Sequence, residues 1–173
     1  NDFVKLVNPD LGSIEDMKAD VLKKINENFE ERSRQAYDRD LSDDLIKKIG
    51  FDTPPSMVDN YLKNILEDVK KQNNGEPVDE EKVLETYRPS AERNLKWYLI
   101  RKKIIDEEQL SVERKDIDGE IENLVSRSPN SEKEIRRFYK KPSNRQRIED
   151  DMIEKKILEY LGQFAKVKEV EVN

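Results

Sequence analysis

An apolar pattern at α-helical spacing occupies residues 80–111 and sets the strongest limit on the fold. One set of side chains recurs on one side of the helix: Leu84, Tyr87, Ala91, Leu95, Tyr98 and Ile105. A second set lies on a different side: Trp97, Ile100 and Ile104. Because a helix that is apolar on two sides must contact neighbours on both, we expect residues 80–108 to form the central helix of the protein.

Pro89 lies inside this pattern. A proline removes one backbone donor and crowds the preceding turn of a helix. The apolar residues keep the same phase before and after it, which favours one kinked helix over two separate helices. We therefore expect a kink near residues 87–89.

The amino-acid composition favours an elongated, all-α, single-domain protein with a thin core. Charged residues make up 42% of the 173 residues and hydrophobic residues only 34%. The net charge is only −6, so the composition does not indicate disorder, which is typical of a high net charge. Helix-forming residues dominate the sequence, so we expect a helical body. The resemblance described below adds the expectation that helical-hairpin arms project from it.

The sequence lacks the residues that several functional classes require. There is no cysteine and no histidine, so thiolate chemistry, disulfides and imidazole catalysis are absent. No glycine-rich phosphate loop and no catalytic motif is recognisable, and we expect no enzyme activity, no cofactor and no metal. No apolar run is long enough to cross a membrane, and no signal peptide is visible. The chain lacks an initiator methionine, which favours an excised piece of a longer protein.

Capping residues and breakers divide the rest of the chain into further helices. The expected caps are Ser13 (with Asp16), Thr53, Asp79, Ser111, Ser131 (with Glu134) and Ser143 (with Gln146), and Gly50 is expected to end the first helix. The expected helices cover residues 13–49, 56–72, 80–108, 112–126, a short segment after 131, and 144–165. Residues 1–12 are expected to be an extended lead-in, and residues 166–173 a short strand or a disordered tail.

Each cluster of charged residues can be interpreted either as a binding site or as a solvated helix face. The carboxylate runs at residues 43–44, 106–108 and 149–151 could bind Mg²⁺, but adjacent helical residues point in different directions, so we favour solvated faces. Residues 133–147 combine seven basic side chains with Phe138 and Tyr139, as nucleic-acid surfaces do. No RNA-binding motif accompanies them, and the mildly acidic chain argues against direct nucleic-acid binding.

Eight apolar or amphipathic residues are candidates for a binding surface and, alternatively, for the core. If exposed, they would form a surface that contacts other polypeptides, for which adaptable methionine and amphipathic tyrosine are well suited. The candidates are Met57, Tyr61, Trp97, Ile100, Ile104, Phe138, Tyr139 and Met152. For Trp97, Ile100 and Ile104 we favour burial against another helix.

Four motifs occur in a familiar order. They are Gly12-Ser-Ile-Glu-Asp-Met-Lys18, then Phe51-Asp52-x-Pro54-x-x-Met57-Val58-x-x-x-Leu62, then Pro89-x-Ala91-Glu92-Arg93-x-Leu95-Lys96-x-x-Leu99-Ile100-x-x-x-Ile104-x-x-x-Glu108-x-Leu110-x-Val112, and finally Phe138-Tyr139 before the closing helix. Together they resemble the C-terminal domain of trigger factor, the bacterial ribosome-associated chaperone, from about Phe3 onward.

The resemblance implies a helical body with two arms that cradle unfolded or nascent polypeptides without ATP, in the cytoplasm. The family's N-terminal ribosome-docking domain and its prolyl isomerase domain are absent from this sequence, so ribosome contact would require the missing N-terminal domain. The resemblance leaves open whether the protein forms a weak homodimer. Two rival interpretations are a structural or adaptor protein with one specific partner, and a related periplasmic chaperone.

Overall fold

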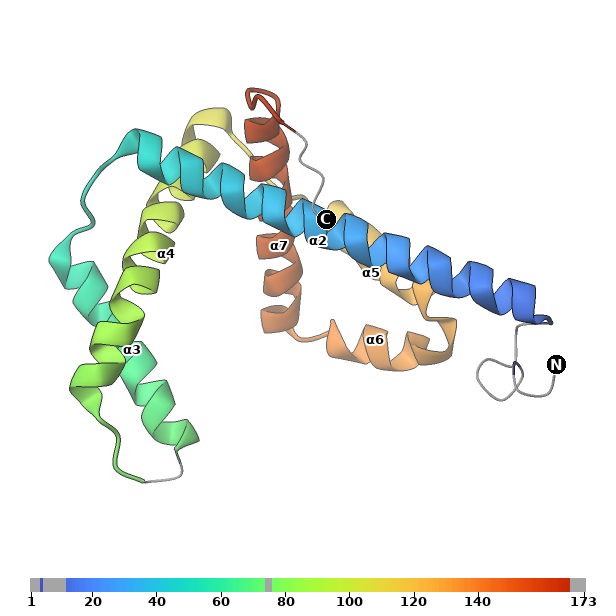
Figure 1. Cartoon of the computed structure of the whole chain (residues 1–173), viewed down its shortest axis with the longest axis horizontal. Helices are drawn as coiled ribbons and strands as arrows, with labels where there is room; N and C mark the ends of the chain where they lie inside the picture. Colours follow the sequence, from blue (N-terminus) through green and yellow to red (C-terminus); the bar gives the residue numbers. More distant parts are fainter. Residues whose placement is uncertain (1–3, 5–11, 74–75, 169–173) are drawn as a thin grey trace. The chain divides into compact units, whose positions relative to one another are not determined.

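The protein is all-α in the part of the chain that the computed structural model describes, which is residue 4, residues 12–73 and residues 76–168. Figure 1 shows the helices and their short connections, and no strand occurs among these residues. None of the described helices is both long and apolar enough to cross a membrane. The expected lead-in falls almost wholly outside the described residues, as do residues 169–173 of the tail, while residues 166–168 have no regular structure.

Helix α2 (Ile14–Ile49) is a single continuous helix with the predicted ends. The Ser13 hydroxyl accepts a hydrogen bond from the Asp16 backbone N–H at 3.0 Å, which caps its first turn. Gly50 ends it with φ of 59°, the left-handed conformation in which glycine carries no steric penalty. The chain divides into two compact units, residues 1–41 and residues 42–173, and this helix contributes to both.

Most of the large apolar side chains of α2 in the first unit are exposed, whereas Met17, Tyr37 and Leu41 are half-buried. The exposed ones are Ile14, Val21, Leu22, Ile25 and Phe29. The last turns of α2 belong to the second unit, where Asp43 accepts a hydrogen bond from the Arg93 Nε at 2.7 Å. That contact joins the end of α2 to the central helix.

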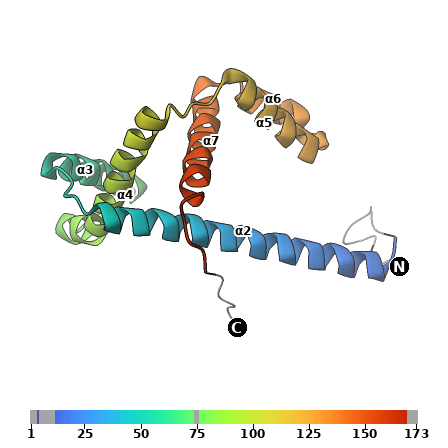
Figure 2. The same ribbon diagram turned by 90° about the horizontal axis from the view of Figure 1, so that it is seen from above.

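Helices α3 (Pro55–Gln72) and α4 (Glu80–Glu108) lie side by side as a hairpin (Figures 1 and 2). Asp79 caps α4 as predicted, accepting from the Lys82 backbone N–H at 3.1 Å. Four buried side chains form the core between the two helices: Val58, Leu62, Ala91 and Leu95. The small side chain of Ala91 allows close approach of the two backbones.

Helix α4 runs without a break through Pro89, as the constant phase of the pattern predicted. The first apolar face is buried only in part, because Tyr87 is 41% exposed and Tyr98 is 53% exposed. Ile100 on the second face is only 5% exposed, which confirms the burial that we favoured for it. The reason is a change of partner. After Leu95 the helix leaves α3 and contacts α7 (Pro142–Gly162), to which Trp97 donates a hydrogen bond at Glu154.

The C-terminal helices form a second core. Helix α5 (Arg114–Arg127), a 3₁₀ turn (Pro129–Ser131), helix α6 (Glu132–Phe138) and helix α7 follow one another. Their buried centre consists of Ile117, Ile121 and Ile148. Ile157 of α7 is fully buried. Phe164 falls within the range expected for the last helix, residues 144–165, but it is 71% exposed because the helix ends at Gly162.

Four predicted caps are wrong. Helices α3 and α7 begin at Pro55 and Pro142, and a proline in the first turn supplies the required φ without a side-chain cap from Thr53 or Ser143. Helix α5 begins at Arg114 rather than after Ser111, with the Glu113 N–H donating to Asp116 at 3.1 Å. Ser131 precedes α6 but makes no side-chain capping bond.

Candidate functional site

Five of the eight candidate residues line hollows in the second unit. The largest of three, called here the α6 hollow, has a volume of about 880 Å³ and is lined by Leu124, Arg127, Ser128, Glu134, Ile135, Arg137, Phe138, Tyr139 and Lys141. The α7 hollow, of about 440 Å³, is lined by Glu120, Leu124, Tyr139, Ile148, Asp151, Met152, Lys155, Lys156 and Glu159. The α4 hollow, of about 320 Å³, is lined by Leu45, Ile49, Phe51, Leu99, Ile100, Lys103, Ile104, Glu107 and Leu161.

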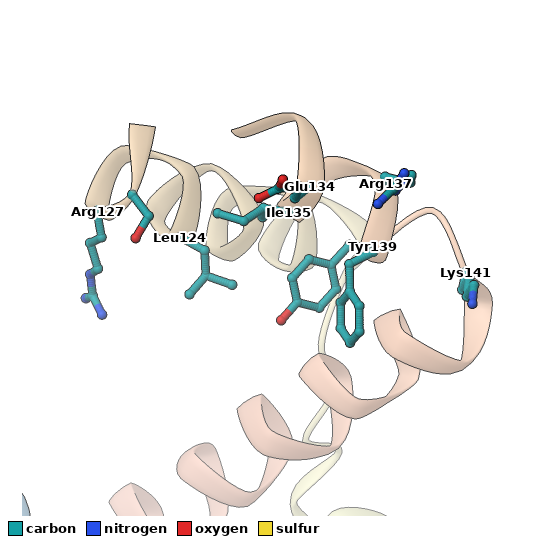
Figure 3. A pocket seen from close by; sticks show the side chains of 9 residues that line it. Leu124, Arg127, Glu134, Ile135, Arg137, Tyr139 and Lys141 are labelled. Carbon is teal, nitrogen blue, oxygen red and sulfur yellow. The ribbon is translucent and has the colours of Figure 1, made fainter. Parts of the chain in front are cut away.

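The apolar wall of the α6 hollow is supported by the core beneath it. Leu124, Ile135 and Tyr139 are partly buried and pack against the Ile117–Ile121–Ile148 cluster. Figure 3 shows the Leu124 and Tyr139 side chains pointing into the same space. Because the core holds these side chains in place, the wall is formed before any ligand binds, which lowers the ordering cost of binding.

Phe138 is the most exposed of the candidates, with 51% of its surface accessible. It is the last residue of the short helix α6, and its ring meets that of Tyr139 edge to face with centroids 5.0 Å apart. The buried side chain of Asn144 donates a hydrogen bond to the Phe138 carbonyl oxygen at 2.7 Å. The backbone of Phe138 is therefore fixed while much of its ring is open to solvent.

Arg136 holds α6 onto α5 beside this hollow. Its guanidinium donates to both carboxylate oxygens of Glu122 and, at 2.8 Å, to Glu132. The hydrogen bond from Arg136, and secondarily its charge, lowers the pKa of Glu122, and the same bonds raise the pKa of Arg136. A bidentate pair of this kind fixes geometry as well as adding attraction.

Arg136→Gln is expected to destabilise α6 on α5 at neutral pH and to have little effect in acid. Since the pKa of Glu122 is lower in the folded state, its pairing stabilises the fold above the ordinary carboxyl pKa of about 4.3 and is lost as the pH falls through the lowered value. Melting temperatures of both proteins between pH 7 and pH 3 would measure this. If the difference in melting temperature between the native protein and Arg136→Gln stayed constant with pH, the Arg136–Glu122 pair would not be its cause. Glu122→Gln should behave like Arg136→Gln.

The α7 hollow shares Leu124 and Tyr139 with the α6 hollow and adds Met152. Met152 and Tyr139 both pack against the Ile117–Ile121–Ile148 cluster. The structure thus brings three candidates, Phe138, Tyr139 and Met152, to one surface formed by α5, α6 and α7. The flexible thioether of Met152 suits contacts with side chains of different shapes.

The remaining candidates lie elsewhere. Ile100 and Ile104 line the α4 hollow, where Lys103 and Glu107 pair with each other at 2.9 Å. Trp97 is partly buried, and its indole N–H donates to Glu154. Met57 and Tyr61 pack against the α3–α4 core, and the Tyr61 hydroxyl accepts from Asn94 at 3.3 Å.

Leu124, Ile135 and Arg127 were not predicted as site residues from the sequence. Leu124 and Ile135 are residue types common in any helix core, and Arg127 lies outside the basic segment at residues 133–147. Only the packing of α6 on α5 brings them to one hollow. Among the described residues, no group of three or more metal-binding side chains is close enough to hold a metal ion.

Comparison with known protein families gives a match over most of the chain. Residues 13–163 match the family described as the C-terminus of bacterial trigger factor protein. The match includes every helix described above in full, from α2 to α7. It covers both buried clusters and the three hollows.

Individual relatives agree with the family match. The chain is 32% identical over 120 residues to the trigger factor of Chlorobaculum parvum, covering 68% of this chain and 28% of the relative. It is 22% identical over 179 residues to that of Treponema denticola, covering 97% and 40%. With the trigger factor of Salinibacter ruber it shares 25% identity over 170 residues, covering 92% and 36%. The aligned region therefore spans less than half the length of these relatives.

Proposed function

The chain belongs to the trigger factor family of chaperones and corresponds to its C-terminal domain, and from this premise we propose that it binds unfolded or nascent polypeptides without ATP. Binding would occur on apolar surfaces of the second unit, chiefly the one formed by α5, α6 and α7. Its place of action would be the cytoplasm. Ribosome docking and prolyl isomerisation would belong to parts of the protein outside this sequence.

The exposed aromatic ring of Phe138 beside the α6 hollow carries this proposal. Exposed aromatic side chains next to an apolar hollow mark binding surfaces in monomeric proteins. Tyr139, Leu124 and Met152 extend the apolar surface from the α6 hollow into the α7 hollow. Ile100 has little accessible surface, so the α4 hollow would contribute mainly through Ile104 and its neighbours.

Separated hollows suit a protein that holds many different clients. Each hollow is small enough that it would bind an apolar segment weakly, since most of the gain from apolar burial is offset by ordering costs. Several weak sites on one chain raise the effective affinity for a long unfolded polypeptide. A folded protein, which exposes few apolar segments, would bind poorly.

Phe138→Ser is expected to weaken binding of an unfolded client roughly fivefold, because about half of an aromatic side chain's burial energy is at stake. The measurement is the affinity for a permanently unfolded, fluorescently labelled protein, together with suppression of its aggregation. Phe164→Ser is the matched control, since Phe164 is an exposed aromatic residue that lines none of the three hollows. If both substitutions had equal effects, or neither had any, the proposed surface would be wrong.

The second candidate function is a structural or adaptor role with one specific partner. The charge-rich amphipathic helices and the exposed apolar face of α2 are compatible with it. A peptide array distinguishes the two functions. Binding to many aromatic and aliphatic peptides supports the chaperone, whereas one tight hit supports the adaptor.

A further inference from the structure

We propose that the α6 hollow selects polypeptide segments in which an aromatic or aliphatic residue is flanked by acidic side chains. This inference rests on the proposed function and deepens it, because it names the class of segment that the α6 hollow would take. It depends on the charges around the hollow, which the proposed function does not use.

The α6 hollow carries an excess of positive charge. Arg127, Arg137 and Lys141 line it together with a single carboxylate, Glu134, which leaves a local charge of +2. The local charge of the hollow is therefore opposite in sign to the net charge of the whole chain, which is −6. Within the described residues, none of these three cations has a carboxylate within ion-pair distance.

Two neighbouring cations on the same helices are paired. Arg136, adjacent to Arg137, binds Glu122 and Glu132, and Arg145 binds Asp118. Carboxylates are therefore available on the outer surface of α5 and α6. Lys133, Lys140 and Arg147 also lack a carboxylate partner among the described residues, but they do not line the hollow. Only Arg127, Arg137 and Lys141 are placed where an acidic group bound in the hollow could reach them.

The cations lie on both sides of the apolar wall. In Figure 3, Arg127 stands at one end of the hollow and Lys141 at the other, with Leu124 and Tyr139 between them. A segment that places an apolar residue against Leu124 and Tyr139 would carry its flanking residues toward these cations. Acidic flanks would then form charge-assisted contacts, and basic flanks would be repelled.

The adjacent α7 hollow has the opposite charge. Three carboxylates line it, Glu120, Asp151 and Glu159, against two lysines. Both lysines are already engaged, Lys155 with Glu159 at 3.8 Å and Lys156 with Asp116 at 3.6 Å. The sign of the charge thus changes across the shared Leu124–Tyr139 wall, which makes the preference for acidic flanks specific to the α6 side.

Three labelled peptides test the proposal on the whole chain. They share one Phe-Leu-Phe centre and differ only in flanks of Asp and Glu, of Ser, or of Lys. Fluorescence anisotropy at low salt is expected to show the acidic peptide binding roughly tenfold more tightly than the basic one, with the difference shrinking in 0.5 M salt as screening increases. Because the chain is acidic overall, non-specific electrostatics would give the reverse order.

Charge-reversed variants locate the effect. Arg137→Glu with Lys141→Glu is expected to reverse the preference, so that the basic peptide binds more tightly. Lys133→Glu with Lys140→Glu changes the net charge of the same segment by the same amount without altering a residue that lines the hollow, and it is expected to keep the acidic preference. Circular dichroism of both variants checks that they remain helical.

The outcomes separate this inference from the proposed function. Equal binding of the three peptides, weakened for all by Phe138→Ser, would overturn the acidic preference and leave the chaperone function standing. Failure to bind any of them would overturn both. Tight binding of a single-stranded RNA oligomer that is lost in Arg137→Glu with Lys141→Glu, while peptide binding is unchanged, would assign the cations to nucleic acid and overturn the inference.

Discussion

Leu62→Ala is expected to lower the free energy of unfolding of the α3–α4 hairpin by about 2–5 kcal/mol. The Leu62 side chain is 1% exposed and lies in the buried cluster with Val58, Ala91 and Leu95. Truncation removes apolar burial and leaves a cavity that two short helical surfaces cannot easily close. In a protein with so few buried residues, one such loss is a large fraction of the total stability.

The destabilisation should remain local. The α3–α4 cluster and the Ile117–Ile121–Ile148 cluster have no residue in common, and α3 packs chiefly on α4. Amide hydrogen exchange of Leu62→Ala is therefore expected to show lost protection in α3 and the first half of α4, with protection in α5 and α7 retained. Leu22→Ala, at an exposed position in α2, is the control and should change stability by less than about 0.5 kcal/mol. Equal loss of protection in both clusters would contradict two separate cores.

The all-α class and the existence of each helix were predictable because they depend on local chemistry. Ser13, Gly50 and Asp79 act within one turn of their own helices, so their effects can be inferred from neighbouring residues alone. Thr53 and Ser143 were assigned wrongly because a nearby proline can start a helix equally well. The choice between two adequate start signals is not made by local sequence.

The buried side of α4 could be predicted only in part. Two apolar sides correctly indicated two partners, but spacing does not say where along the helix one partner gives way to the other. Tyr98 belongs to the first apolar set yet is exposed, because α7 approaches from the side of Trp97 and Arg101. Tertiary contact therefore decides which of two equally apolar faces is buried.

The candidate site could likewise be predicted only in part. Phe138, Tyr139 and Met152 were identified from residue type, since aromatic and methionine side chains among charges stand out. Their convergence on one surface required α6 to fold back on α5, and the unpaired state of Arg127 and Arg137 required knowing which carboxylates reach which cations. Pairing at a distance of ten or more residues leaves no periodic signal in the sequence.

Glu154→Ala is expected to destabilise the contact between α4 and α7 by about 1–2 kcal/mol. One carboxylate accepts the Trp97 indole N–H at 2.9 Å and lies 2.6 Å from the Arg101 Nε. Hydrogen bonds to a charged group contribute more to the free energy of unfolding than neutral ones do. Arg101 and Glu154 are partly exposed, and solvent screening reduces the contribution of their contact. Trp97 is the only tryptophan in the sequence, so its fluorescence reports directly on this contact, and its emission should shift to the red.

Two further variants isolate the role of the charge. Glu154→Gln keeps an oxygen for the Trp97 N–H and removes the negative charge that Arg101 contacts, so we expect the emission of the native protein with intermediate stability. Glu159→Ala removes an exposed carboxylate of α7 that only approaches Lys155 at 3.8 Å, and it should change neither emission nor stability measurably. If Glu154→Ala also left both unchanged, the carboxylate would not join the helices, and α4 and α7 would be held together by apolar packing alone.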